Sequence, residues 1–287
     1  MIRQSSLPVS RASRTLGVSA RAYYQWQRRK EPADTNALVI EQIHEIALEF
    51  PRYGYRRVTH TLRRNGELVN HKRVLRLMKE ENLLVRRKRF TPKTTQSNHG
   101  LPKYPNLVKD LALTGINQAV VSDITYIRLL REFVYLAVMM DLFSRRCVGW
   151  AVSRNPDAQL TLDALNKVIE LRGAANLAGC IHHSDQGVQY AAYAYVQRLQ
   201  EVSMLSSMGE QGNSYENAFA ESFIKTIKYD EVHMNEYETL EDVHRNIRQF
   251  IEEVYNKKRL HSSIGYRPPI EFEEKKDTVI FSGYEVF

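Results

Sequence analysis

Hydrophobic and polar positions change their period along the chain, from helical in the first third to alternating in the middle. Between residues 36 and 85, apolar side chains recur at the three- and four-residue spacing of amphipathic helices. Further along, β-branched and aromatic residues gather in runs separated by short polar breaks, which predicts an antiparallel meander. These runs span residues 119–129, 133–142 and 145–153. The pattern therefore predicts a helical region followed by an α/β domain.

A helix predicted at residues 71–82 has the two faces that a recognition helix needs. Asn70 is placed to cap its start. The face expected to be buried consists of Val74, Leu77 and Met78, spaced at i, i+3 and i+4. The basic residues expected to contact DNA are Lys72, Arg73, Arg76 and Lys79. A solvated basic helix is the alternative, and the basic run at residues 86–89 favours DNA contact.

Shorter helical segments precede this helix. Residues 10–27 predict two short helices around a turn, with Ser19 as N-cap of the second, and either a helix-turn-helix or an ordinary hairpin fits them. A helix over residues 55–64 is expected to end at Asn65-Gly66. We divide the chain into a helical segment at 1–35, a helix-turn-helix domain at 36–90, a proline-containing linker at 91–112, a core at 113–235, and a C-terminal helical extension and tail at 236–287.

Beyond the meander, the pattern alternates between helices and one short strand. Amphipathic helices are predicted at residues 156–171, 190–199, 215–229 and 239–255. A short apolar strand is predicted at residues 178–183, and the glycine-containing segment 206–214 predicts a mobile loop. This order of elements indicates an α/β fold in which helices flank a mixed sheet.

Composition excludes several classes of protein. With 43% hydrophobic residues among 287, the chain can bury a substantial core. Its longest apolar run, residues 133–140, is too short to span a membrane, and the N-terminus lacks the apolar core of a signal peptide. Cys147 and Cys180 cannot form a disulfide framework or a cysteine-rich zinc site. A cytoplasmic protein with reduced thiols and no membrane partner is expected.

Charge is divided unevenly along the chain. The formal net charge is +8, from 41 Lys and Arg against 33 Asp and Glu. Residues 1–105 contain 22 basic and 8 acidic residues, whereas the remaining 182 residues contain 19 and 25. The basic third is typical of a protein that binds a polyanion, most simply nucleic acid. The acidic remainder is of interest because acids near nucleic acid often hold metal ions.

Three acidic residues stand out by their positions in the predicted elements. Asp123 lies inside the first strand, where ionised residues are disfavoured, and Asp185 directly follows the short strand. Glu221 lies on the helix predicted at residues 215–229. Carboxylates that met over a sheet would repel one another unless cations lay between them, and Mg²⁺ suits such oxygen ligands. Two ions about 3.5–4 Å apart can activate an attacking oxygen and stabilise a leaving one at phosphorus.

The helix that carries Glu221 has a predicted packed side and a polar side. The packed side consists of Phe219, Phe223 and Ile227, and the polar side adds Asn217, Lys225 and Lys228 to Glu221. Both lysines are placed to hold DNA phosphates beside the acids. His182 and His183 either orient a carboxylate or a water, or pack structurally. Asp141 is either a fourth acid of the site or, as we favour, the cap of a turn.

At these residues the sequence resembles a known family. The segments DITYI, HSDQGVQY and NAFAESFIKTIK resemble the motifs of insertion-sequence transposases of the second-reading-frame type, which have a catalytic core like that of retroviral integrases. The 35 residues between Asp185 and Glu221 match the family's Asp-Asp-35-Glu spacing. The segments YGYRRV, HKRVLRLMKEENL and YNKKRLHSSIGYRPPIEF are also similar to that family's sequences. The resemblance therefore covers nearly the whole chain.

The resemblance implies a fold, an activity and a set of partners. The implied fold is a ribonuclease-H-like core with a mixed five-stranded sheet, preceded by an all-α helix-turn-helix region. Asp123, Asp185 and Glu221 would be the catalytic triad and would bind two Mg²⁺ or Mn²⁺ ions, with Lys225 and Lys228 near the DNA end. The implied activity is nicking of element ends followed by strand transfer. Double-stranded DNA, a homo-oligomer and an upstream-frame protein are the implied partners. A structure-specific nuclease and a DNA-binding regulator with an inactive core are the alternatives.

Overall fold

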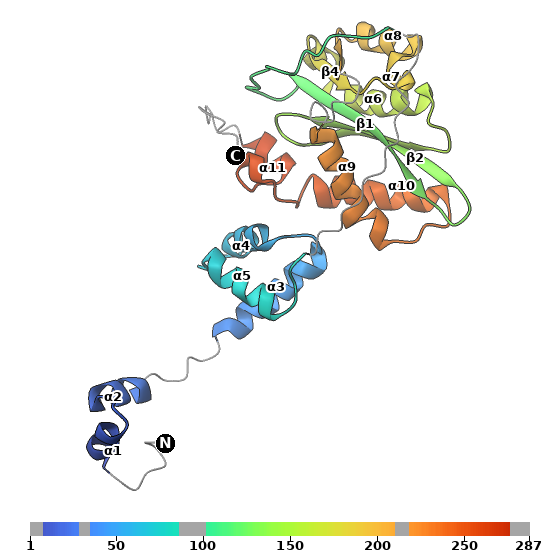
Figure 1. Ribbon diagram of the computed structural model, residues 1–287. Coiled ribbons are helices and arrows are strands. Elements are labelled where there is room, and N and C mark those ends of the chain that lie inside the picture. Colours follow the sequence, from blue (N-terminus) through green and yellow to red (C-terminus); the bar gives the residue numbers. More distant parts are fainter. Residues whose placement is uncertain (1–7, 29–34, 86–101, 210–217, 276–287) are drawn as a thin grey trace. The chain divides into compact units, whose positions relative to one another are not determined.

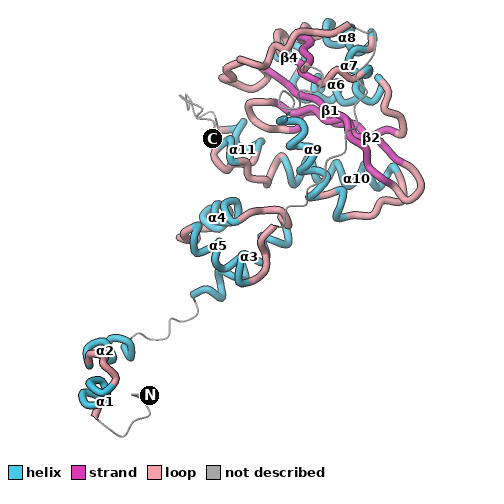
Figure 2. Tube along the Cα trace, viewed as in Figure 1, coloured by secondary structure: helices cyan, strands magenta, loops and turns pink. Residues whose placement is uncertain are grey.

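The computed structural model describes residues 8–28, 35–85, 102–209 and 218–275. The chain falls into two compact units, Met1–Val85 and Arg86–Phe287. Within the described ranges, every strand belongs to the second unit (Figure 2). Several sequence predictions concern residues outside these ranges, namely the basic run 86–89, the linker residues 91–101, the loop residues 210–214, Asn217 and the tail 276–287.

The described part of the first unit is helical. Its elements are α1 (Val9–Thr15), α2 (Ala20–Arg28), α3 (Thr35–Glu49), α4 (Tyr55–Arg64) and α5 (His71–Glu80). The two short helices predicted at residues 10–27 are confirmed as α1 and α2. Gly17 turns the chain between them with a φ of 66°. The Ser19 hydroxyl accepts a hydrogen bond from the Ala22 amide at 3.0 Å, so the predicted N-cap is present.

A small apolar core joins α3, α4 and α5. Ile43 of α3 and Leu62 of α4 are buried, and so are the three residues of α5 that were expected to face inward. The Asn70 side chain accepts a hydrogen bond from the Lys72 amide at 2.9 Å and so caps α5. Gly66, with a φ of 95°, follows α4 at the predicted stop. The predicted helices of this region are therefore confirmed.

A mixed five-stranded sheet forms the centre of the second unit, in the order β3-β2-β1-β4-β5 (Figure 1). Its strands are β1 (Ala119–Arg128), β2 (Phe133–Asp141), β3 (Cys147–Ser153), β4 (Ile181–Ser184) and β5 (Leu205–Met208). The first three are antiparallel neighbours, which confirms the predicted meander. β4 runs parallel to β1 and β5 runs parallel to β4, so the sheet is mixed as predicted.

Helices cover both faces of the sheet. They are α6 (Ala158–Arg172), η2 (Ala174–Leu177), α7 (Val188–Ala191), α8 (Tyr193–Glu201), α9 (Ala218–Asp230), η3 (Val232–Met234), α10 (Leu240–Gln249), the π-helix η4 (Phe250–Tyr255), η5 (Ser262–Ile264) and α11 (Pro269–Glu274). One apolar core joins the sheet to α6, α7 and α8, and the other joins it to α9 and α10. Figure 1 shows these two sets of helices on opposite sides of the sheet. Gly149 lets α6 approach β3 closely, because a Cβ there would lie 2.4 Å from the Ala164 carbonyl oxygen.

Two elements of this unit were predicted wrongly. Residues 205–208, expected to belong largely to a loop, form β5, which pairs with β4 along its full length. The two central residues of β5 are serines, so the strand has no apolar pattern in the sequence. Ser207 can nevertheless be buried, because its hydroxyl has hydrogen-bond partners inside the protein. The helix predicted at residues 190–199 is broken into α7 and α8. Ala192 is extended between them, with φ −62° and ψ 138°.

The C-terminal elements pack on the sheet. Thr239 and Asp242 form a capping box at the start of α10, and α10 with η4 confirms the helix predicted at residues 239–255. Asn256 bonds the amide and the carbonyl of Cys147 on β3, at 3.0 and 2.9 Å. Throughout the described ranges, no helix combines the length and apolar character required to cross a membrane.

Candidate active site

Sheet register brings Asp123 and Asp185 together. β1 and β4 run parallel, and their last backbone pair joins Val121 to His183. Asp123, inside β1, and Asp185, directly after β4, each lie two residues beyond that pair, so they are at the same level of the sheet, where adjacent strands are about 4.8 Å apart. The Gly187 amide donates a hydrogen bond to Asp185 Oδ1 at 3.1 Å, which holds this carboxylate just beyond β4. The position of Asp185 at a strand end is therefore confirmed.

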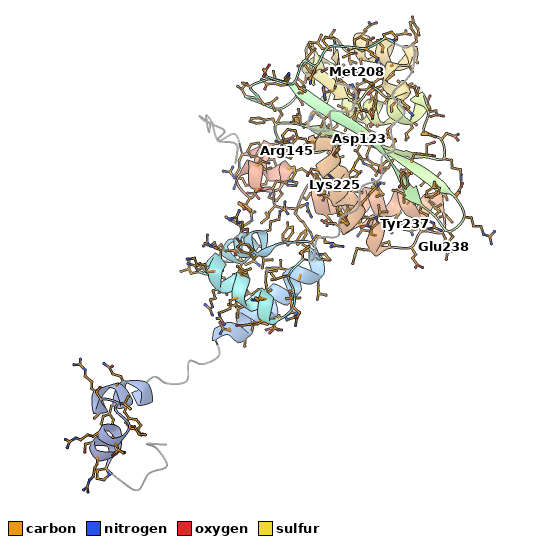
Figure 3. All side chains as sticks on the ribbon, in the orientation of Figure 1. Asp123, Arg145, Met208, Lys225, Tyr237 and Glu238 are labelled. Atoms are coloured by element: carbon orange, nitrogen blue, oxygen red, sulfur yellow. The ribbon has the colours of Figure 1, made fainter. Side chains whose placement is uncertain are left out.

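Glu221 comes from α9, which packs on the sheet face that carries Asp123. Asp123 pairs with Val138 of β2, and Val138 belongs to the apolar core beneath α9. Figure 3 labels Asp123 on β1 and Lys225 on α9. The inner side of this helix consists of Ala220, Phe223, Ile224 and Ile227. Glu221 lies beside that inner side, and its Oε2 is 3.7 Å from Lys225 Nζ.

The three acids interact electrostatically. Burial, the charge of Asp185 and the charge of Glu221 raise the pKa of Asp123 to about 7. A hydrogen bond from the Ile124 amide at 2.8 Å and the charge of Lys228 oppose this shift. An ordinary aspartate has a pKa of about 4. Asp185 and Glu221 are thus near enough for their charges to act on Asp123, and a proton or another cation would relieve this repulsion.

The two lysines of α9 have different surroundings. Lys225 is exposed and faces Glu221. Lys228 is half-buried, and its Nζ lies 4.5 Å from the centroid of the Tyr126 ring on β1. Burial lowers the pKa of Lys228, and the Asp123 carboxylate opposes that effect. Lys228 is therefore held against β1 beside the acids, whereas Lys225 is open to solvent.

A neutral polar network is buried on the opposite face of β1. Ser122 Oγ and the Tyr195 hydroxyl lie 2.8 and 2.9 Å from His182 Nε2. Burial and the neighbouring His183 lower the pKa of His182 to about 3, so its ring stays neutral. These contacts favour the structural interpretation of His182. His183 pairs with Val121 and so lies on the other face, where its Nδ1 is 2.9 Å from Ser207 Oγ of β5.

Tyr190 is a neighbour of the acids that the sequence analysis missed. It lies on α7 and is buried, with its ring centroid 5.7 Å from that of His182. Burial and the charges of Asp123 and Asp185 raise its pKa well above the ordinary value, so the phenol stays protonated. Its position five residues after Asp185, inside the segment HSDQGVQY, is the signal that could have identified it.

Asp141 caps a turn, as favoured from the sequence. Its carboxylate accepts hydrogen bonds from the amides of Asn117, Phe143 and Ser144, at 2.8, 3.0 and 2.9 Å, and from the Ser144 hydroxyl at 3.1 Å. Burial raises its pKa although the amides of Ser144 and Asn117 oppose the shift. With its oxygens occupied by donors, Asp141 belongs to the framework and not to the acid group.

The predicted packed side of α9 is wrong at Phe219. This ring is 49% exposed, because its neighbour Ala220 takes the buried position of the first turn. The inner side is therefore shifted by one residue at the start of the helix. One side of the Phe219 ring is covered by the Arg145 guanidinium, whose carbon lies 3.8 Å from the ring centroid.

The donor set of the acid group suits a hard divalent cation. Asp123, Asp185 and Glu221 offer only carboxylate oxygens, which are the ligands that Mg²⁺ prefers. The repulsion that raises the pKa of Asp123 is what such a cation would relieve. Among the residues that the structure describes, no three His, Cys, Asp or Glu side chains are arranged as a group that could hold a metal ion, so metal binding by these acids stays a prediction.

A second candidate site is the basic stripe on α5. Lys72, Arg76 and Lys79 are exposed, although Arg76 Nη1 lies 2.9 Å from Glu80 Oε1. Arg73 differs from them because its Nε and Nη2 donate to Asn36 Oδ1 at 3.1 and 2.9 Å. It links α5 to α3 in this structure. DNA contact by these four residues stays a prediction.

Comparison with known proteins places both regions in described families. A model of the HTH-like domain matches residues 33–90, and two models of the integrase core domain match residues 114–214 and 203–269. The chain is 37% identical over 265 residues to an uncharacterised 31 kDa protein of insertion element IS600 from Shigella sonnei, covering 90% of this chain and 96% of the relative. It is 31% identical over 278 residues to the transposase InsF of insertion sequence IS3A from Escherichia coli K12, covering 95% and 96%.

Solved structures were also compared with this chain. The catalytic core domain of HTLV-2 integrase in complex with magnesium matches with a TM-score of 0.42 and 12% identity, covering 55% of this chain and 97% of that one. The catalytic domain of the Mos1 mariner transposase matches with a TM-score of 0.40 and 12% identity, covering 48% and 71%.

Proposed function

Because this chain belongs to the insertion-sequence transposases with an integrase core and an HTH-like domain, we propose that it nicks the ends of an insertion sequence and joins them to new DNA. The observation that supports the proposal is that Asp123 and Asp185 lie at the same level on adjacent strands, and that the charges of Asp185 and Glu221 both raise the pKa of Asp123. Such a group of carboxylates has no role in holding the sheet together, but it suits phosphoryl transfer.

Asp123, Asp185 and Glu221 are the proposed catalytic residues and the proposed ligands of two Mg²⁺ or Mn²⁺ ions. When bound, the ions supply the charge that activates an attacking oxygen and stabilises a leaving oxygen at phosphorus. The chain supplies their positions: the sheet register aligns the two aspartates, and the Gly187 amide holds Asp185. Tyr190 is buried near Asp123 and Asp185 and stays protonated.

Lys225 and Lys228 are the proposed contacts to DNA phosphates at the site. Lys225 is exposed one helical turn from Glu221, so a phosphate can replace the carboxylate as its partner. Lys228 is restrained above Tyr126 and is closer to Asp123, which suits it to the phosphate next to the reacting one. Both roles are electrostatic and should weaken with salt.

The helical unit is proposed to bind double-stranded DNA at the element ends. Lys72, Arg76 and Lys79 of α5 present charge to phosphates, and Arg73 can join them only by leaving Asn36. Cutting and joining two ends requires coordination, so a dimer or larger assembly on DNA is part of the proposal. An upstream-frame protein is a further proposed partner, and a cytoplasmic location follows from the DNA substrate.

The test uses purified protein, Mg²⁺ and a supercoiled plasmid that carries this gene between the ends of its own element. Wild type should yield nicked plasmid and then joined strands. Glu221→Gln and Asp185→Asn should abolish both products while still binding the end DNA, because the basic helical unit is unchanged. Unimpaired joining by either variant would contradict the assignment of the acids.

The products also separate the alternatives. Nicks without joined strands would indicate a structure-specific nuclease on the same fold. Binding without any Mg²⁺-dependent nicking would indicate a regulator with an inactive core. A Lys72/Arg76/Lys79 triple alanine variant should bind the end DNA more weakly and with a flatter salt dependence, since phosphate contacts release counterions. If the affinity for the end DNA were unchanged, these three residues would form only a solvent-exposed basic face.

A further inference from the structure

The contact between Arg145 and Phe219 joins two parts of the unit that are distant in sequence. Arg145 lies in the turn between β2 and β3, and Phe219 lies in the first turn of α9, two residues before Glu221. The guanidinium carbon is 3.8 Å from the ring centroid, which is close packing of a cation on an aromatic face. Arg145 is labelled in Figure 3, to the left of α9.

The turn that carries Arg145 is held in an unusual conformation. Arg145 has a φ of 64°, a left-handed backbone that residues with a Cβ rarely adopt. Its amide donates to the Asp141 carbonyl at 2.9 Å, and the Asp141 carboxylate binds the amides of Phe143 and Ser144 in the same turn. An arginine persists in this conformation only where its surroundings fix it. The hydrogen bonds of the buried Asp141 therefore hold the turn in the conformation that places Arg145.

The first turn of α9 is held from two sides. Ala220 faces inward and is buried in the core beneath the helix, whereas Phe219 faces outward and is covered by Arg145. Glu221 follows directly and comes close enough to raise the pKa of Asp123. We propose that Arg145 and Phe219 are positioning residues, which hold the start of α9 so that the Glu221 carboxylate stays beside Asp123. This inference rests on the proposed function of the three acids.

Arg145→Gly is the sharpest test, because glycine adopts a positive φ without strain. The substitution removes the cation but suits the backbone, so the melting temperature should stay the same or rise. Joining of element ends should nevertheless fall about tenfold in kcat, the effect of losing one cation–π contact. The affinity for end DNA should be unchanged, and more Mg²⁺ should be needed for half-maximal rate.

Substitutions of Phe219 test the same contact from the other side. Phe219→Tyr keeps the aromatic face and should join at close to the wild-type rate. Phe219→Leu keeps the hydrophobic volume but removes that face, and should lose activity to the same extent as Arg145→Gly. The double variant should be no worse than either single one, because both remove one interaction.

Ser203→Gly is the matched control. Ser203 also has a left-handed backbone, with a φ of 56°, but it lies between α8 and β5 and is exposed. This variant makes the same backbone change without touching α9 and should join at the wild-type rate. Hydrogen exchange gives a second readout that does not depend on activity. The amides of residues 222–225, which bond to the carbonyls of the first turn, should exchange faster in Arg145→Gly and Phe219→Leu only.

Two results would overturn the inference. Wild-type joining and exchange in Arg145→Gly would show that the contact positions nothing. A loss of end-DNA affinity with an unchanged Mg²⁺ requirement would make Arg145 a DNA contact instead. If wild type itself fails to join ends while Arg145→Gly speeds exchange in α9, the contact holds the helix but the proposed function is wrong.

Discussion

Two groups of acids in the same unit have opposite surroundings. Asp141 is surrounded by donors, including the amide and the hydroxyl of Ser144. Asp123 accepts a hydrogen bond from the amide that follows it but faces the charges of Asp185 and Glu221. Burial raises the pKa of both aspartates. At Asp123 the charge of Asp185 is the next largest contribution and raises the pKa further, whereas at Asp141 the amides of Ser144 and Asn117 and the charge of Arg172 oppose the shift more strongly than the charge of Glu273 adds to it. Burial alone therefore does not distinguish a structural acid from a candidate catalytic one. The groups around the acid do: hydrogen-bond donors surround the structural acid, and other carboxylates lie near the candidate catalytic acid.

Glu273 extends the framework group. Its carboxylate binds Arg146 at 2.6 Å and also pairs with Arg172, and it ties α11 to the turn after β2 and to the end of α6. Although burial opposes it, hydrogen bonds from Arg172, Ser144 and Arg146 hold the pKa of Glu273 below its ordinary value. A buried carboxylate with enough donors is thus stable as an anion. At Asp123, by contrast, one amide hydrogen bond and the charge of Lys228 do not offset burial and the charges of Asp185 and Glu221.

The largest expected effect is on activity. Asp123→Asn should reduce strand joining by roughly a thousandfold or more, because it removes a proposed ligand of the reacting group. Asp141→Asn should retain at least about a tenth of the rate per folded molecule, since it acts only through the turn that carries Arg145. Quantified joined products, normalised to folded protein, provide the measurement. Equal losses in the two variants would remove the distinction between the two groups.

The next effect concerns stability against pH. Asp123 has a pKa of about 7 when folded, against about 4 in an unfolded chain, so between these values the folded protein holds a proton that the unfolded chain has released. The free energy of unfolding should therefore fall as pH rises from about 4 to about 7, by at most roughly 4 kcal/mol, and level off above that. Urea unfolding across this range should show the slope in wild type and a weaker one in Asp123→Asn. If the pH dependence of stability were the same in Asp123→Asn as in wild type, Asp123 would not be the residue that titrates in this range.

Asp141→Asn should destabilise the unit by about 2–3 kcal/mol at neutral pH. The side-chain NH₂ of asparagine would replace a carboxylate oxygen that accepts hydrogen bonds from backbone amides and from the Ser144 hydroxyl, and it cannot accept them. Asp123→Asn should leave stability equal or higher, since it removes repulsion. The two urea midpoints give the comparison directly. Greater stability in Asp141→Asn than in Asp123→Asn would reverse our assignment of the two groups.

The smallest expected effect tests the turn that follows Asp185. A Cβ at Gly187 would lie 3.0 Å from Asp185 Oδ1 and from Gln189 Oε1, so Gly187→Ala should push the carboxylate aside. Joining should fall a few-fold, roughly 1 kcal/mol, with little loss of stability. Gly115→Ala is the control in the same unit, because a Cβ there meets nothing within 4 Å. Equal rates in the two variants would show that the position of Asp185 is not critical.

Much of the fold could be predicted from the sequence because the pattern marks elements that bury one face. The meander, the capped α5 and the helix on both sides of Glu221 follow from this rule. β5 could not be predicted, because Ser206 and Ser207 are polar residues whose burial depends on partners distant in sequence. The break at Ala192 was hidden for a related reason, since helix-forming residues lie on both sides of it.

The candidate site could be predicted only in part. Asp123 conflicts with its place inside a strand, whereas Asp185 and Glu221 were singled out by their positions at a strand end and on a helix, and the catalytic role of all three stays a prediction. Arg145 carries no such signal, because its left-handed backbone and its contact with Phe219 exist only in the folded chain. Sequence pattern locates residues that break local rules, whereas residues that act through tertiary contact need the structure.

The most direct test of the central claim is a calorimetric titration of Mn²⁺ into three proteins at neutral pH: wild type, Asp123→Asn and Asp141→Asn. If the acids beside Asp123 hold a divalent cation, wild type and folded Asp141→Asn will both show saturable binding. Asp123→Asn will then show at least about tenfold weaker binding, as expected when a ligand is removed. Binding by Asp123→Asn as tight as that of wild type would contradict the claim that these acids form the metal site.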